Sequence, residues 1–290
     1  MEFFKAEKVT DRIYRISGII TEYMYLVVGT DQALLIDTGC GAGDIHAFVR
    51  TLTDLPLTVV LTHGHYDHAG GAGRFPEVWL DSRELEPTPI HYLKNATYEK
   101  LKSGHPTLRL EDMTPDAGET ATKDPSGAAI CTTSVPVTFR PLTPGKLFAL
   151  GGITAEAIPC PGHTPGTYCI LLVEERLLLT GDACHSISYL FFDNALTIEE
   201  YRQNLIALNR QKDRWDSLLL SHPIATAPKT MIDEVIHLCD QILAGTTDEI
   251  PWPWQDKPVY IAKAIDDRML RQDGVYGNII FRKDKLRKHM

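Results

Sequence analysis

The chain has 290 residues, of which 43% are hydrophobic, and a formal net charge of −9. A chain of this length can bury one large core, so we expect a single domain over residues 1–290. The acidic balance offers no basic surface to a phosphate backbone and argues against a nucleic-acid partner.

The sequence pattern leads us to expect neither a targeting segment nor a structural disulfide. The first eight residues, Met1 to Lys8, contain no apolar segment before a small-residue cleavage site, so we expect no secretory signal and a cytoplasmic location. No apolar run approaches the roughly 18 residues that a bilayer-crossing helix needs, so we expect no membrane partner. The cysteines lack CxxC spacing and should remain free thiols, and we expect Cys184 to be a small buried side chain.

The N-terminal part predicts β-structure. Residues 13–16, 23–28 and 33–36 fit a meander of antiparallel strands, with a turn at residues 29–32. Residues 45–52 fit a short helix, and the apolar, β-rich run 57–61 fits a buried strand. This strand leads directly into a cluster of histidines.

The second half predicts the same arrangement of strands that lead into polar residues. Residues 153–158, 177–180 and 218–220 fit strands that precede His163, Asp182 and His222. A helix should begin at Thr197, whose spacing to Glu200 is that of a capping box, and a second should span residues 231–243 with Gly245 just after its end. Loops at the ends of strands can gather residues that are distant in sequence.

Two segments stand apart from this pattern. Residues 103–146 are rich in Pro, Gly, Thr and Asp, which predicts an irregular insertion that either covers the site or lies on the surface. The extension after residue 245 should end in a strand near residues 274–281, followed by a basic, solvated tail at residues 282–288.

The chemistry is concentrated in the segment from Thr62 to Gly71, where His63, His65, Asp67 and His68 occur within six residues. Imidazole nitrogens and carboxylate oxygens are ligands that zinc accepts, and catalytic zinc sites leave a position for water. A cluster of this density after a buried strand predicts a metal site. We interpret the other histidines as ordinary core or surface residues: His46, His91, His105, His185, His237 and His289.

Taken together, these motifs resemble those of the metallo-β-lactamase superfamily. The matching segments are HxHxDH at 63–68, LIDTG at 35–39, PGHTPG at 161–166, TGDA at 180–183 and SH at 221–222. The resemblance implies an α/β fold, an αββα four-layer sandwich with two mixed sheets flanked by helices and the metals at one edge of the sheets.

The resemblance also implies a set of ligands for two divalent metal ions. It places His63, His65 and His163 on the first ion and Asp67, His68 and His222 on the second, with Asp182 bridging them. We expect zinc, with iron or manganese as alternatives. Asp37 matches an acid that orients a ligand histidine without binding metal.

The implied function is a dinuclear metal-dependent hydrolase that acts through a metal-bridging hydroxide on a small ester, thioester or lactone. Asp67 and Asp182 are the expected catalytic carboxylates, and Asp67 could accept a proton from the water. For Tyr66, Tyr168 and Tyr189 we favour packing over hydrogen bonding to substrate. We expect a small-molecule substrate, and the sequence is compatible with a homodimer.

Several alternatives share these motifs. A mononuclear iron sulfur dioxygenase, a phosphodiesterase of the same superfamily and a non-catalytic metal-binding protein all remain open. True β-lactamases lack the bridging aspartate that Asp182 supplies, and diiron reductases usually carry a carboxylate where His65 stands. The general resemblance is to glyoxalase-II-like and lactonase-like hydrolases.

Overall fold

The structure is a computed structural model that describes residues 3–85, 137–254 and 257–288. The chain divides into two compact units, Met1–Leu142 with Phe148–Thr154 (unit 1) and Thr143–Leu147 with Ala155–Met290 (unit 2). Among the described residues, every helix is too short or too polar to cross a membrane.

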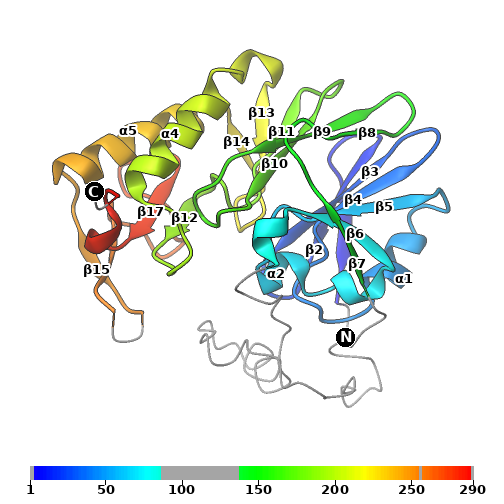
Figure 1. Ribbon diagram of the computed structural model, residues 1–290, viewed down its shortest axis with the longest axis horizontal. Helices are drawn as coiled ribbons and strands as arrows, with labels where there is room; N and C mark the ends of the chain where they lie inside the picture. Colours follow the sequence, from blue (N-terminus) through cyan, green and yellow to red (C-terminus); the bar gives the residue numbers. More distant parts are fainter. Residues whose placement is uncertain (1–2, 86–136, 255–256, 289–290) are drawn as a thin grey trace. The chain divides into compact units, whose positions relative to one another are not determined.

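Unit 1 is built on a mixed sheet of seven strands in sequence order (Figure 1). These are β1 (Lys5–Lys8), β2 (Ile13–Ser17), β3 (Tyr23–Val28), β4 (Ala33–Ile36), β5 (Leu57–Val60), β6 (Glu77–Leu80) and β7 (Thr138–Pro141). The strands β1 to β4 pair antiparallel, which confirms the predicted meander. From β4 to β7 the pairing is parallel.

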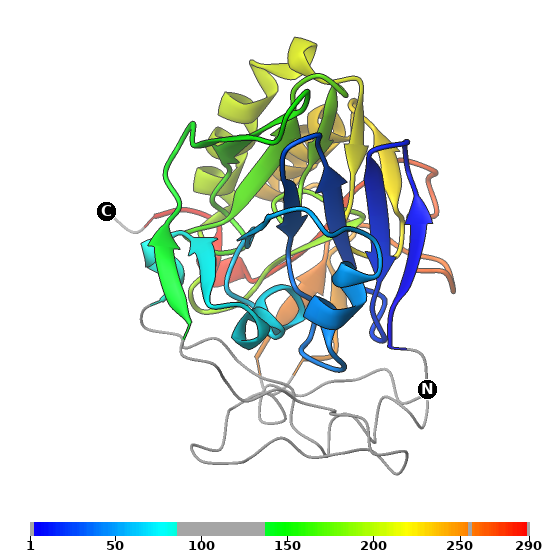
Figure 2. The same ribbon diagram turned by 90° about the vertical axis from the view of Figure 1, so that its right-hand side faces the viewer.

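One face of this sheet is covered by α1 (Ile45–Arg50), which lies beside the strands in Figures 1 and 2. Ile45 and Val49 are buried and pack with Leu35 and Val59 of the sheet. The helix begins where the Asp44 carboxylate accepts a hydrogen bond from the Ala47 amide, which satisfies one of the unpaired amides of the first turn. Short 3-10 helices follow at Ala72–Arg74 (η1) and Ser82–Glu84 (η2).

A second mixed sheet has the strand order β14-β13-β11-β10-β9-β8, and its residues from Ala155 onward belong to unit 2. Its strands are β8 (Leu147–Ala149), β9 (Thr154–Pro159), β10 (Tyr168–Leu172), β11 (Leu177–Leu179), β13 (Ser217–Leu219) and β14 (Thr226–Pro228). Since β10 is antiparallel to both β9 and β11, and β11 is parallel to β13, the strands β9, β11 and β13 run in one direction. Their carboxyl ends therefore lie at the same edge of the sheet.

Two helices, α4 (Ile198–Asn209) and α5 (Met231–Ala244), lie side by side in unit 2 (Figure 1). Both predictions are confirmed. Thr197 and Glu200 form the capping box, and Gly245 ends α5 in the left-handed conformation with φ of 67°. The buried faces of the helices pack on Leu171, Leu178 and Leu218 of the six-stranded sheet. A 3-10 turn, η4 (Lys212–Arg214), precedes β13.

A third sheet, which the sequence did not predict as a unit, has the order β12-β17-β16-β15. Its strands are β12 (Ile187–Leu190), β15 (Ile250–Trp252), β16 (Val259–Ile261) and β17 (Asn278–Phe281). The expected terminal strand is β17, and it pairs parallel with β12 and antiparallel with β16. Each of these strands has only three or four residues, too few for a clear period. The short helix η5 (Lys283–Lys285) follows β17.

Two sequence predictions need correction. Residues 137–146 of the predicted insertion are not all irregular, since Thr138–Pro141 form β7. Pro141 is tolerated there because it ends an edge strand, where a missing amide costs no ladder bond. Residues 103–136 lie outside the described part of the chain. The basic tail is not simply solvated, since the Lys285 ammonium donates to the carbonyl oxygens of Phe192 and Asp193 at 2.7 and 2.8 Å.

Candidate metal-binding residues

The histidine cluster of unit 1 lies at the carboxyl ends of two adjacent parallel strands. Asp37 follows β4, and Leu61 and Thr62 follow β5, whose register pairs Ile36 with Val60. His63 and His65 lie in the loop after β5, whereas Asp67 and His68 lie on the single turn α2 (Tyr66–Ala69). We call these four residues the N-terminal ligand group.

Asp37 positions residues of this group through hydrogen bonds to Thr62 and His68. Its Oδ1 accepts a hydrogen bond from the Thr62 amide at 2.7 Å, and its Oδ2 accepts from the Thr62 hydroxyl at 2.9 Å. The same Oδ2 lies 2.8 Å from His68 Nδ1. Because a carboxylate can only accept, Nδ1 carries the proton and His68 Nε2 carries the lone pair that a metal needs.

Thr62 determines the position of the ring proton of His63 in the same way. The Thr62 hydroxyl gives its proton to Asp37, so it accepts from His63 Nδ1, 3.1 Å away. His63 thereby also has its lone pair on Nε2. Asp37 itself adopts φ of 64°, a left-handed conformation that is uncommon outside glycine and that brings its carboxylate to this position.

Close backbone approach fixes the loop that carries the predicted ligands. The Thr38 amide and hydroxyl both donate to the His68 carbonyl oxygen, at 2.7 and 2.9 Å. A Cβ on Gly71 would lie 2.4 Å from the Thr38 carbonyl oxygen, so only glycine fits there. The Gly64 amide, between His63 and His65, donates to the buried Glu84 carboxylate at 2.9 Å.

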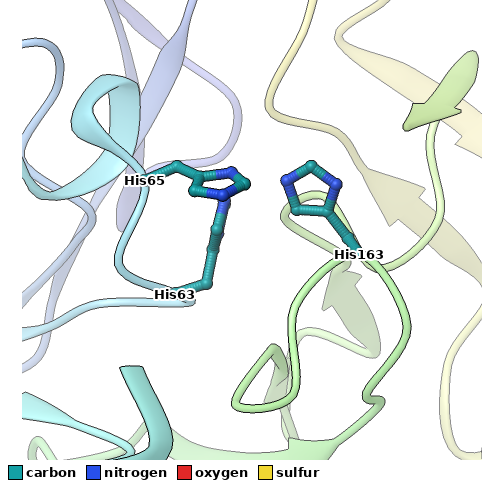
Figure 3. A group of neighbouring side chains, drawn as sticks. All are labelled: His63, His65 and His163. Atoms are coloured by element: carbon teal, nitrogen blue, oxygen red, sulfur yellow. The ribbon is translucent and has the colours of Figure 1, made fainter. Parts of the chain in front are cut away.

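The rings of the N-terminal ligand group gather close to one another. The centroids of His63 and His65 are 4.8 Å apart at an interplanar angle of 74°, and those of His63 and His68 are 4.2 Å apart. Figure 3 draws His63 and His65, which come from the loop after β5, with His163, which comes from the turn after β9. Asp67 Oδ2 lies 3.7 Å from His68 Nε2. Of these side chains, His63 and His68 are fully buried and Asp67 is partly exposed.

In unit 2 the three predicted ligands follow the three strands that run in one direction. His163 follows β9, Asp182 follows β11 and His222 follows β13, so they meet at one sheet edge. We call them the C-terminal ligand group. His163 Nδ1 lies 2.8 Å from the Tyr189 carbonyl oxygen, which can only accept. The proton is therefore on Nδ1, and the lone pair of His163 is on Nε2.

Asp182 lies between the two histidines of its group and offers one oxygen to each. Its Oδ2 is 3.4 Å from His163 Nε2, and its Oδ1 is 3.4 Å from His222 Nε2. Two ligand atoms at 2.0–2.1 Å from the same tetrahedral zinc ion lie roughly 3.3 Å apart. The spacing in unit 2 therefore fits a carboxylate that shares one ion with each histidine.

The sequence analysis did not identify one residue that lies beside Asp182 and His222. His185, interpreted as an ordinary histidine, is buried with Nε2 3.9 Å from Asp182 Oδ2 and its ring centroid 5.6 Å from that of His222. Its position three residues after Asp182 is the sequence feature that could have indicated this contact.

Tyr66 and Tyr168 are buried, and Tyr189 is half-buried with its ring on Phe191. Burial raises the pKa of the Cys184 thiol well above its ordinary value, so it stays a thiol.

The chain belongs to the metallo-beta-lactamase superfamily, because the sequence profile of that family matches residues 20–222. It has the metallo-β-lactamase fold, an α/β fold with mixed sheets, as a metallo-beta-lactamase from Pontibacter korlensis does. That structure matches with a TM-score of 0.56 and 16% identity over 82% of this chain and 99% of that chain. At this identity the likeness concerns the fold alone.

Two curated relatives carry names that describe an activity. The chain is 28% identical over 172 residues to the "Acyl-coenzyme A thioesterase MBLAC2" of Gallus gallus, covering 56% of this chain and 57% of that protein. It is 25% identical over 165 residues to the "Probable metallo-hydrolase YqgX" of Bacillus subtilis, covering 57% of this chain and 67% of that protein. The match thus spans little more than half of the chicken protein.

Proposed function

We propose that this chain is a metal-dependent hydrolase that holds two divalent metal ions. His63, His65 and His163 bind the first ion, Asp67, His68 and His222 bind the second, and Asp182 binds both. Membership of the superfamily, the imidazole and carboxylate donors of each unit and the names of the two curated relatives support the proposal.

The position of Asp182 is the observation that carries this proposal. A carboxylate held by hydrogen bonds alone would lie about 2.7–2.9 Å from its donors, since charge-assisted bonds are short. Both oxygens of Asp182 instead lie 3.4 Å from the ring nitrogens that they face. Two ligands of the same metal ion lie about this far apart. Because Asp182 has two oxygens, it can bind one ion through each of them.

The residues around the ligands have definable roles in hydrolysis. Metal ions of this kind lower the pKa of water toward about 7 and polarise a carbonyl oxygen. Asp37, Thr62 and the Tyr189 carbonyl keep the ring protons on Nδ1, so that the opposite nitrogens face the ligand position. Asp67 is partly exposed and is positioned to receive the proton of an attacking water. The proposed substrate is a small ester, thioester or lactone.

Elemental analysis and a substrate panel test this function. The protein, purified without chelator, is assayed for Zn, Fe and Mn and for hydrolysis of a thioester, a lactone and a phosphodiester. We expect two zinc ions per chain and turnover of the thioester or lactone, with metal and activity both lost in Asp182→Asn. Asp216→Asn is the matched control, since Asp216 is exposed and pairs only with basic side chains in the described structure. One iron ion with oxygen consumption on a persulfide would refute the hydrolase proposal.

A further inference from the structure

A cluster of aromatic side chains in unit 2 extends from a proposed metal ligand. Its members, which we call the aromatic cluster, are Tyr189, Phe191, Phe192, Trp252 and Trp254. Phe191 is fully buried and forms the base of the cluster with Val259 and Ile261 of β16. The other four aromatic residues are only partly buried.

The rings form a continuous series of edge and tilted contacts. The His163 ring meets Phe192 edge-on with centroids 5.7 Å apart, and Phe192 meets Trp254 at 5.9 Å. Phe191 lies 4.4 Å from Phe192 and 4.7 Å from Trp254. Apart from the slightly shorter Phe191–Phe192 pair, these separations are within the favourable range for aromatic pairs, roughly 4.5–7 Å, so the rings hold one another in place. The apolar surface therefore begins directly at the ligand His163.

Charged side chains fix the segment that carries Phe192 from its outer side. Asp193 accepts from Lys257 at 2.8 Å and from Arg282 at 2.6 Å, and these cations lower the pKa of the Asp193 carboxyl. Lys285 donates to the carbonyl oxygens of Phe192, Asp193 and Ala195. The negative charge of Asp193, next to Phe192, is therefore compensated. The C-terminal residues Arg282 and Lys285 hold the segment that contains Phe192 in place.

The aromatic cluster packs on a buried core, and its partial exposure next to His163 is the feature that points to a ligand. Single exposed apolar side chains are common on soluble proteins, but a contiguous aromatic surface beside a reactive centre is a feature of ligand sites. Fully enclosed rings would serve stability better, because partly exposed rings gain less from burial. Because the rings are already held in place, they lose little conformational entropy when a ligand binds, which favours binding.

We propose that the aromatic cluster binds the apolar part of the substrate, an aryl group or an alkyl chain of several carbons attached to the hydrolysed ester or thioester. This inference rests on the proposed hydrolase function and specifies its substrate class. The reacting carbonyl lies on the His163 side, and the apolar group extends along Phe192 and Trp254. Each methylene that leaves water on these rings raises kcat/KM by about fourfold.

A chain-length series tests the inference on the metal-loaded full chain. Hydrolysis of p-nitrophenyl acetate, butanoate, hexanoate and octanoate is compared in the wild type, Phe192→Leu, Trp254→Leu and Tyr260→Leu. Tyr260 lies in β16, but its ring packs with the core around α4 and α5, opposite to Val259 and Ile261. We expect kcat/KM to rise about fourfold per methylene in the wild type and in Tyr260→Leu, and this slope to fall by half or more in the two cluster variants.

Two further arms separate this inference from the proposed function. Thioesters with one acyl group and leaving groups of increasing length show which side of the scissile bond contacts the cluster. Equilibrium binding of octanoate, compared with acetate, needs no turnover. If the wild type binds octanoate but hydrolyses none of the esters, and Trp254→Leu loses octanoate binding, the aromatic site is supported and the hydrolase proposal is refuted. Hydrolysis with equal kcat/KM along every series, and no preference for octanoate, would overturn the inference and leave the hydrolase proposal intact.

Discussion

Replacing Asp37 by asparagine tests whether the buried carboxylate sets the ring protons of the proposed ligand histidines. The side chain keeps its size, and its Oδ1 can still accept from the Thr62 amide, a bond of 2.7 Å. The amide nitrogen, however, replaces Oδ2, which accepts from the Thr62 hydroxyl and from His68 Nδ1. An N–H group then faces both donors.

His68 can satisfy this new donor only by moving its proton from Nδ1 to Nε2, where the proton blocks the metal. Loss of such an orienting partner typically lowers metal affinity by about 10–100-fold. The Thr62 hydroxyl also loses its acceptor, so the free energy of unfolding of the metal-free protein should fall by about 1–3 kcal/mol, the cost of one unpaired buried group.

The assay is zinc retention during dialysis against a competing chelator, combined with urea unfolding of the metal-free protein. Asp44→Asn is the control of the same chemical change, because Asp44 is a helix cap for which asparagine is an equally good residue. An Asp37→Asn protein that keeps wild-type zinc affinity would show that the carboxylate does not set the tautomer of His68.

Three further predictions follow from other contacts. Glu84→Ala removes the acceptor of the Gly64 amide and should lower kcat/KM about tenfold, whereas Glu84→Gln, which keeps an acceptor, should retain it; equal activity of both would contradict this role. Thr197→Ala should lower the free energy of unfolding by about 1 kcal/mol through loss of the capping box, and an unchanged urea midpoint would exclude that contribution. Chelation of the metals should destabilise the fold by about 2.7 kcal/mol for each ion present at 100 times its Kd, measured by the thermal midpoint with and without chelator.

The long, regular elements could be predicted because their signals are local. The meander, the strand at Leu57–Val60 and the helices α4 and α5 follow from periodicity, a capping box and a terminal glycine. The third sheet could not be predicted, since β12, β15, β16 and β17 are short and the pairing of β12 with β17 joins residues about 90 positions apart, as in Ile187 with Asn278. The basic tail was misinterpreted because the carbonyl acceptors of Lys285 lie near Phe192, far away in sequence.

The family and the seven candidate ligands could be inferred without a structure, because the spacing within HxHxDH and the later motifs is a local property of the chain. How these side chains are held depends on contacts between residues that are distant in sequence. The proton positions of His63, His68 and His163 depend on Asp37, Thr62 and the Tyr189 carbonyl, partners that pairing between strands and turns brings into contact. The same holds for His185 and the aromatic cluster, whose contacts with Asp182 and His163 depend on strand packing. Hydrogen bonds and ring contacts act over a few ångströms of space, and a sequence pattern does not specify those distances.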